Sequence, residues 1–295
     1  MAIAREIRRR IRGVRSTGQI AKAMETVAAS RMQRAQAQTL ASRPYAEKAL
    51  FVLRSLARQA RPTGESLHPL LVQRPVERVA VVLYTADRGL CGAFNSNMNR
   101  KAVEFVKNQA YPVSFITVGR KGRDFLSRYG FQVAAEFIGI PDRPSLLDML
   151  PVARVAIDDY LAGNWDMVYL AHTDFVNTLI QRPTITRLLP LEPVWETGAP
   201  TSVDYIYEPD PRTILDQVLP RFTELQIYQA MLESIASEQS ARMVAMRNAR
   251  EAAMDLIASL TLKYNKARQE AITTELLDIA GGAEALAKVT SGARG

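Results

Sequence analysis

Cysteine and histidine are almost absent from this chain of 295 residues. The sequence has one cysteine, Cys91, and two histidines, His68 and His172. A single cysteine excludes an intramolecular disulfide and is typical of a protein in a reducing compartment. Protein zinc sites gather several cysteine, histidine or carboxylate ligands, and these three residues lie far apart in the sequence. The composition therefore argues against a disulfide framework or a zinc centre, and we expect no cofactor.

Long apolar runs are also missing. No run of about 18 consecutive apolar residues occurs, so the sequence predicts no transmembrane helix. The N-terminal segment is an arginine-rich amphipathic pattern without the apolar core of a signal peptide. We therefore expect this segment to be part of the folded protein.

Glycine and proline are absent from residues 221–280. A helix of that length would span roughly 90 Å at a rise of 1.5 Å per residue, which is more than one compact domain can bury. Sustained steps of three and four residues between small or apolar positions predict a coiled-coil seam. The positions of this stripe are Leu225, Tyr228, Leu232, Ala236, Gln239, Met243, Met246, Ala249, Ala253, Leu256, Leu260, Tyr264, Ala267 and Ala271. Their small size favours a thin rod of two helices.

A second long helix is predicted over residues 1–60, and its stripe is also thin. The stripe consists of Ile3, Ile7, Ile11, Val14, Ala21, Met24, Ala28 and Met32. Gly13 and Gly18 weaken the helix locally, and Pro44 predicts a kink or a break. If the intervening residues fold as one domain, the chain returns antiparallel and the helices at its two ends can pair. The alternative is two independent amphipathic helices packed on a globular core.

Positive charge is concentrated in the first helix. Residues 1–60 hold 13 basic and three acidic residues, whereas 61–210 carry a net charge of −2 and 211–295 are neutral. Six arginines lie between Arg5 and Arg15. Such a helix suits nucleic acid, an anionic membrane surface or an acidic protein partner, unless it is simply a solvated face. Aromatic side chains are not interleaved with these arginines, which weakens the nucleic-acid alternative.

Residues 61–210 predict a central α/β domain with a Rossmann-like open sheet. Alternating strands and helices imply a mostly parallel sheet covered on both faces. The expected strands are Val79–Thr85, Val113–Val118, Phe131–Ile138 and Met167–Ala171, with edge strands at Thr184–Leu189 and Tyr205–Tyr207. The expected helices are Asn95–Gln109, with Asn95 or Ser96 as N-cap, Lys121–Tyr129, and Ser145–Leu161, whose first half Pro151 should disturb.

Catalytic motifs are not evident in this domain. The loop Asp87–Asn95 leads from a strand into a helix, but it is neither a dinucleotide fingerprint nor a P-loop. The segment Gly119–Gly122 has the outline of a KH-domain GXXG loop without the surrounding pattern. His172 has no accompanying nucleophile, and Asp158 and Asp159 face different sides of a helix. A nucleotide-dependent enzyme remains an alternative, although a phosphate motif and a catalytic base are both missing.

Three segments together resemble the γ subunit of the F-type ATP synthase. They are Ile20–Gln36 (IAKAMETVAASRMQRAQ), Asp87–Asn95 (DRGLCGAFN) and Ser237–Leu286, which contains YNKARQ followed by ITTEL. The resemblance covers both ends of the chain and their order. Ala93 stands where the family often has a glycine. The cysteine pair of the chloroplast forms is absent, which indicates a bacterial-type complex.

The resemblance implies a rotor shaft without a catalytic site of its own. Its implied partners are the hexamer of α and β subunits, the ε subunit and the membrane ring of c subunits, with no nucleic acid. The expected location is the cytoplasmic face of the plasma membrane, as a peripheral component. The implied domains are 1–60, 61–210 and 211–295. The implied coupling contacts are Met24, Arg31, Arg242, Arg268 and Gln269, and the implied structural turn residues are Gly89, Cys91 and Gly92.

Overall fold

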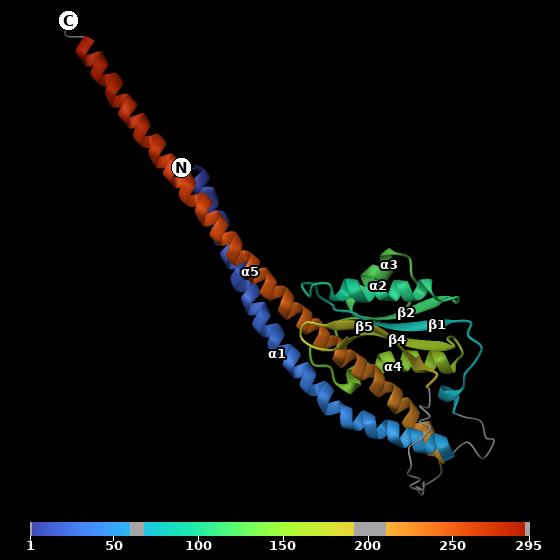
Figure 1. The fold of residues 1–295 in the computed structure, drawn as a ribbon. Coiled ribbons are helices and arrows are strands. Elements are labelled where there is room, and N and C mark those ends of the chain that lie inside the picture. The colour runs from blue at the N-terminus through green and yellow to red at the C-terminus, as the bar shows by residue number, and fades with distance from the viewer. Residues whose placement is uncertain (1, 60–67, 192–210, 293–295) are drawn as a thin grey trace. The chain divides into compact units, whose positions relative to one another are not determined.

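The computed structural model describes residues 2–59, 68–191 and 211–292 (Figure 1). The first and last described elements are long helices, α1 (Ala2–Gln59) and α5 (Pro211–Gly292). Between them in the sequence lies an α/β region, as expected. The edge strand expected at Tyr205–Tyr207 lies outside the described residues. No helix in the described part of the chain is long and apolar enough to cross a membrane.

The chain packs as two units that do not follow the order of the sequence. One unit joins Met1–Thr26 with Met246–Gly295, and the other consists of Val27–Ala245. Each long helix therefore contributes to both units. The domains expected from the sequence keep each long helix whole, whereas the packing units divide each long helix in two.

In the first unit, α1 and α5 run antiparallel. Arg247 Nε lies 3.1 Å from Glu25 Oε1, and a Cβ atom placed on Gly18 would lie 3.3 Å from the Cβ of Ala253. The earlier residue of α1, Gly18, faces the later residue of α5, Ala253, and Glu25 faces Arg247. The two helices therefore run in opposite directions, which confirms the predicted antiparallel pair. The helices approach closely at Gly18 because neither facing residue is larger than alanine.

In α5 the seam differs from the predicted stripe at two positions. Ala249 and Leu256 are exposed, while Arg250 and Ile257 are partly covered. Both registers alternate steps of three and four, so the apolar pattern cannot distinguish them. Arg250 takes the place of Ala249 because its Nε lies 3.6 Å from Glu25 Oε2. In α1 the covered stripe starts later than expected, since Ile3 is 69% exposed.

Three helices continue through a proline, so the break considered at Pro44 does not occur. α1 continues through Pro44, and α5 continues through Pro220. α4 (Leu146–Leu161) also contains Pro151. Its first turn is held by Asp148, whose Oδ2 accepts hydrogen bonds from Ser145 N and Ser145 Oγ, both at 2.7 Å. Proline has a helix-compatible φ, so one missing backbone donor is tolerated where the rest of the helix is well anchored.

The second unit is built on a five-stranded sheet of order β3-β2-β1-β4-β5. Strands β1 to β4 are parallel neighbours, and β5 runs antiparallel to β4. The strands are β1 (Val79–Tyr84), β2 (Val113–Val118), β3 (Val133–Phe137), β4 (Met167–Phe175) and β5 (Gln181–Leu189). The other helices are η1 (Pro69–Leu71), α2 (Phe94–Lys107) and α3 (Arg120–Arg128). All six residues of β1 are buried, which is typical of a central parallel strand.

Helices cover both faces of the sheet (Figure 1). On one face, alternate β1 residues such as Val81 and Leu83 pack in a cluster with Met98 of α2 and Leu126 of α3. On the other face, Ala80, Val82 and Tyr84 belong to a larger cluster with residues of α4, α5 and α1. The α5 segment 222–245 has no exposed residue. A helix covered all round behaves as a core element, so this segment forms part of the domain core.

Gly13 and Gly18 provide a matched pair of substitutions. Gly13→Ala is expected to stabilise the paired helices by about 0.5–1 kcal/mol, because alanine lowers the backbone entropy lost on folding. No atom lies within 4 Å of the added Cβ at Gly13. Gly18→Ala should give a smaller gain or a loss, because its Cβ presses on Ala253. Thermal and urea unfolding followed by circular dichroism measure both effects. Equal gains would contradict the close approach at Gly18.

Candidate functional site

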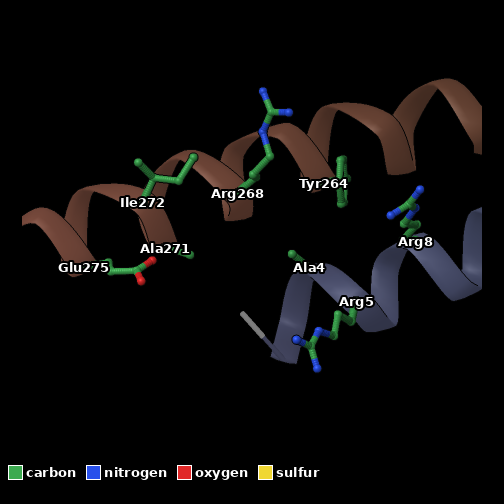
Figure 2. A pocket seen from close by; sticks show the side chains of 8 residues that line it. All are labelled: Ala4, Arg5, Arg8, Tyr264, Arg268, Ala271, Ile272 and Glu275. Carbon is green, nitrogen blue, oxygen red and sulfur yellow. The ribbon is translucent and has the colours of Figure 1, made fainter.

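A cavity of about 350 Å³ lies between α1 and α5 in the helical pair. Figure 2 shows its lining from both helices. The lining residues are Ala4, Arg5, Arg8, Tyr264, Arg268, Ala271, Ile272 and Glu275. The space is present because Ala4 and Ala271 have side chains too small to fill it. We call this cavity and its lining the arginine groove.

The arginine groove has an excess of positive charge. Arg5, Arg8 and Arg268 contribute three guanidinium groups, and Glu275 contributes one carboxylate. All three arginines are exposed, and among the described residues none has an ion-pair partner. Gln269, the next residue of α5, is exposed and does not line the groove. Exposed guanidinium groups suit planar anionic partners such as carboxylates.

Met24 lies next to an ionic contact that joins the two helices. Its side chain is partly buried. The neighbouring Glu25 is 15% exposed at its side chain and lies near Arg247 and Arg250 of α5. A charged triplet of this kind pins the relative position of two helices that otherwise meet through small residues. Met24 is therefore held within the helical pair, where part of its surface is open.

The turn before α2 is closed by side chains that bind the backbone. Asn95 Oδ1 accepts a hydrogen bond from Ala86 N at 2.9 Å, so Asn95 closes the turn instead of acting as the helix N-cap. The N-cap position is held by Ala93. Gly92 has a φ of +56°, which favours glycine. Cys91 is buried, and burial raises the pKa of its thiol. Cys91 is thus a buried residue of this turn.

Arg242 attaches this turn to α5. Its Nη2 donates to the carbonyl of Gly89 at 3.3 Å and lies 2.7 Å from Glu238 Oε1 on the preceding helical turn. Both side chains are largely buried. Burial raises the pKa of Glu238, and Arg242 partly offsets this shift. Arg242 therefore holds a loop of the sheet domain against α5.

Arg31 has a partner in the same unit. Its Nη1 lies 2.9 Å from Asp142 Oδ2, with side chains 34% and 57% exposed. Exposed ion pairs typically contribute less than about 1 kcal/mol, so this pair leaves Arg31 accessible to another anion. The five residues expected as coupling contacts do not form one cluster. Arg268 lies at the arginine groove, Met24 and Arg31 are elsewhere on α1, and Arg242 faces the turn.

Sequence reasoning did not find several of these contacts. Glu238 and Arg242 are four residues apart on a helix, which is a recognisable ion-pair spacing. Nothing in the sequence indicates that Arg242 also reaches Gly89, because 153 positions separate the two residues. The Glu25 contact across the helical pair was missed because the predicted stripe used Ala249. Such contacts depend on register, which the apolar pattern does not determine.

The carboxyl end of the sheet is the place where open α/β domains bind ligands. Here α5 crosses the end of β4. Ser237 Oγ donates to Thr173 O at 3.0 Å, and Thr173 N donates to Ser234 Oγ at 3.3 Å. After β1, the Asp87 carboxylate accepts hydrogen bonds from Arg120 N and Gly139 N, both at 2.9 Å. These polar groups at the described edge are therefore already bonded to the protein.

Removal of Arg242 tests its role at the turn. Arg242→Ala is expected to lower the free energy of unfolding by about 3–5 kcal/mol, because Glu238 is left buried without its cation. The loss should be smaller near pH 5 than near pH 8, since protonation of Glu238 removes the unpaired charge. Urea unfolding at both pH values measures this loss in the free energy of unfolding. Arg247→Ala, in a more exposed pair, is the control and should cost less than about 1 kcal/mol. Similar losses for the two variants would contradict the role of Arg242.

The sequence matches the ATP synthase family over residues 3–286. An ATP synthase gamma chain of Dehalococcoides mccartyi is 54% identical, with 97% of this chain and 100% of the relative covered. The ATP synthase gamma chain of Herpetosiphon aurantiacus is 55% identical, with 97% and 99% covered. These alignments extend over both long helices and the α/β region.

Solved structures show the same fold. A chain of the central stalk and c-ring of the Tetrahymena thermophila mitochondrial ATP synthase matches with a TM-score of 0.59 and 25% identity, covering 78% of this chain and 99% of that one. A chain of the Euglena gracilis mitochondrial ATP synthase in rotational state 3 matches with a TM-score of 0.66 and 20% identity, covering 97% and 95%. By sequence and by fold, this chain belongs to the ATP synthase gamma chain family.

Proposed function

We propose that this chain is the central-stalk rotor subunit of an F-type ATP synthase. In this role it couples transmembrane proton flow to ATP synthesis at the catalytic β subunits, and it carries no catalytic site itself. Family membership over nearly the whole chain carries this proposal. The proposed partners are the hexamer of α and β subunits, the ε subunit and the ring of c subunits. The proposed location is the cytoplasmic face of the plasma membrane, through these partners.

The helical pair has the properties that a shaft needs. Its seam uses small residues such as Ala21 and Ala253, both buried, so the two helices lie close together. A narrow pair with a continuous backbone is stiff along its axis. Its outer surface carries exposed charged side chains such as Arg9 and Arg12 beside exposed apolar ones such as Ile20 and Leu262. These features support a part that turns inside a sleeve.

The last described turns of α5 also support a surrounding partner. Every described residue from 272 to 283 is exposed. The set includes large apolar side chains, namely Ile272, Leu276, Leu277 and Ile279, at 48%, 62%, 67% and 65% exposure. Clusters of exposed apolar side chains usually mark an interaction site. We propose that the hexamer covers them.

The coupling contacts are proposed at the residues whose side chains remain accessible. Arg268 and Gln269 would bind polar groups of the hexamer, and the partly open Met24 and Arg31 would add contacts along α1. Arg242 would act indirectly, by holding the turn with Gly89, Cys91 and Gly92 against α5. In this proposal, 1–60 and 211–295 form the shaft, and 61–210 form the domain that meets the ε subunit and the c-ring.

Purification of the tagged chain from its own cells separates the possible functions. Stoichiometric recovery with ATPase α and β subunits supports the rotor. Recovery with nucleic acid instead would favour the basic coiled-coil alternative, and bound nucleotide without partner subunits would favour an enzyme. Either of those results would overturn the proposal.

Substitution of Arg268 and Gln269 tests the coupling contacts. Arg268→Ala with Gln269→Ala should leave helix content unchanged, because exposed substitutions typically shift stability by less than about 0.5 kcal/mol. It should lower ATP turnover or ATP-driven proton pumping of the reassembled complex, because each charge-assisted contact contributes about 1.5–3 kcal/mol. Arg268→Lys should lose less than the alanine variant.

Lys263→Ala is the matched control for this test. Lys263 is exposed on the same helix and does not line the arginine groove. Its substitution should leave turnover and pumping near the wild-type level. Unchanged activity in the double variant would show that Arg268 and Gln269 are an ordinary solvated face. A loss of helix content would assign them to helix packing instead.

The α/β domain is expected to bind no nucleotide. The motif after β1 lacks a phosphate-binding lysine, and polar groups at the end of β4 are bonded to α5. Isothermal titration calorimetry of the isolated chain should therefore give no binding heat with ATP or NAD at millimolar concentration. Saturable binding in the micromolar range would contradict this prediction.

A further inference from the structure

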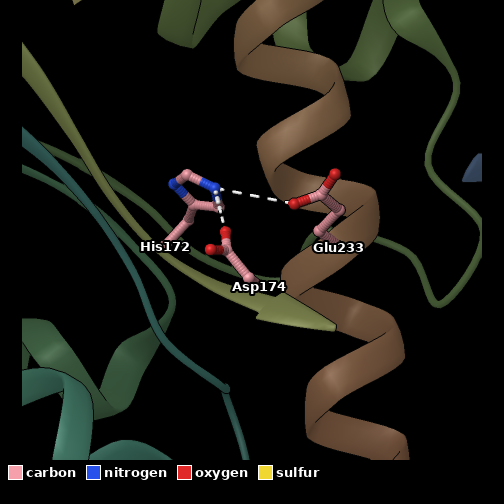
Figure 3. Close-up of side chains that lie close together, drawn as sticks. All are labelled: His172, Asp174 and Glu233. Atoms are coloured by element: carbon pink, nitrogen blue, oxygen red, sulfur yellow. Dashed lines mark ion pairs between the residues drawn. The ribbon is translucent and has the colours of Figure 1, made fainter. Parts of the chain in front are cut away.

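His172 of β4 lies between two carboxylates from different elements. Its Nε2 is 2.9 Å from Asp174 Oδ1 on the same strand and 3.6 Å from Glu233 Oε2 on α5. The three side chains are 9%, 35% and 22% exposed, in that order. Figure 3 shows both carboxylates on the side of the ring that carries Nε2. We call these three residues the His172 cluster.

The cluster lies where α5 is fastened to the sheet. Thr173, between His172 and Asp174, is hydrogen-bonded to Ser234 and Ser237 of α5. On the other side, Thr184 of β5 donates to Asp174 Oδ2 at 2.6 Å and orients that carboxylate. The neutral hydrogen bonds and the charged cluster therefore hold the same short segments of β4 and α5.

The two carboxylates need a cation between them. Like charges in a partly buried site repel, and an imidazolium placed between them removes this cost. Burial lowers the pKa of His172, but hydrogen bonds to Asp174 and Glu233 outweigh it and raise this pKa to about 9. The same hydrogen bond from His172 lowers the pKa of Asp174, and Arg182 of β5 adds to this shift. The charged groups that act on the cluster are thus Asp174, Glu233 and Arg182.

A proton fits this position better than a metal ion. A divalent cation would need the same Nε2 atom and two carboxylate oxygens. Metal-bound histidines usually donate the other ring N–H to a carboxylate or carbonyl. His172 Nδ1 is buried and has no hydrogen-bond partner among the described residues. The second support expected for a metal ligand is therefore missing, whereas a protonated imidazole directs its Nε2–H toward the two carboxylates, and its positive charge offsets theirs.

We propose that His172 is a proton-dependent clamp, in which the positive charge of the protonated imidazole holds Glu233 of α5 to Asp174 of β4, and in which loss of the Nδ1 proton in alkaline conditions removes this charge and weakens the contact. The proposal goes beyond the rotor function and does not depend on it. The folded-state pKa of His172 lies above the ordinary value of 6.5. The stabilisation is thus complete below about pH 6.5 and is lost as the pH rises through about 9. At neutral pH the clamp is closed.

Nuclear magnetic resonance of the two imidazoles tests the clamp directly. Burial lowers the pKa of His68, with Asp216 partly offsetting this effect, so the two histidines should titrate on opposite sides of 6.5. His172→Gln assigns the signals by removing one of them. In EDTA-containing buffer, the His172 signal should titrate near pH 9. Titration of His172 at or below 6.5 would overturn the proposal.

Two isosteric variants separate the clamp from general effects of alkaline pH. Glu233→Gln should lower the His172 pKa and should flatten the loss of stability between about pH 7 and pH 10, because one carboxylate is gone. Each unit of pKa change corresponds to a tenfold change in the folded-to-unfolded ratio. Asp216→Asn, beside His68, is the control and should leave the His172 titration unchanged. If Glu233→Gln and the wild type lose stability equally, α5 is not held by the clamp.

Zinc provides a further outcome. The His172 titration of the wild-type chain should be the same after dialysis against EDTA and after addition of equimolar zinc. A zinc-dependent loss of the His172 titration that leaves the His68 titration unchanged would assign the cluster to a metal ion and overturn the proton clamp. Hydrogen exchange of amides near Glu233, corrected for intrinsic pH dependence, should accelerate above pH 9 in the wild type more than in Glu233→Gln.

Discussion

The structure depends on the continuity of α5. One backbone hydrogen-bond ladder runs from Pro211 to Gly292, and the absence of glycine and proline over 221–280 keeps it unbroken there. The same helix must meet two environments. Between residues 222 and 245 it has no exposed residue, while from Met246 to Ala271 only every third or fourth residue is covered.

Both apolar burial and polar contacts hold α5 to the sheet. Ile227 and Met231 belong to the main core, and Tyr84 OH donates to the carbonyl of Ile227 at 2.9 Å. One turn further along, the contacts become polar, first at the His172 cluster and then at Arg242. Apolar burial is strong but tolerates sliding, whereas a hydrogen bond or a buried ion pair requires one register. The polar contacts therefore determine where α5 lies along the sheet.

The α/β domain has an open, mostly parallel sheet, and polar groups at the carboxyl ends of β1 and β4 are hydrogen-bonded to the protein. The loop after β1 is shaped by Asn95 and Gly92, and its carbonyl at Gly89 is bound by Arg242. Polar groups that elsewhere would face a phosphate are bonded here to the protein. The sheet domain thus packs against residues 222–245 of α5, none of which is exposed.

The sequence by itself determined the types of the elements and the pairing of the long helices. The strand Val113–Val118 was predicted at its observed ends, because a short run of β-branched and aromatic residues between a proline and a glycine has few other solutions. Family resemblance supplied the role. Only the tertiary structure decided the register: Arg250 replaced Ala249 in the seam because Glu25 is within reach, and Arg242 reached Gly89 across 153 positions. Periodicity specifies which face of a helix is apolar. The register of one element against another depends on long-range packing, and this register determines which charged side chains come within reach of one another.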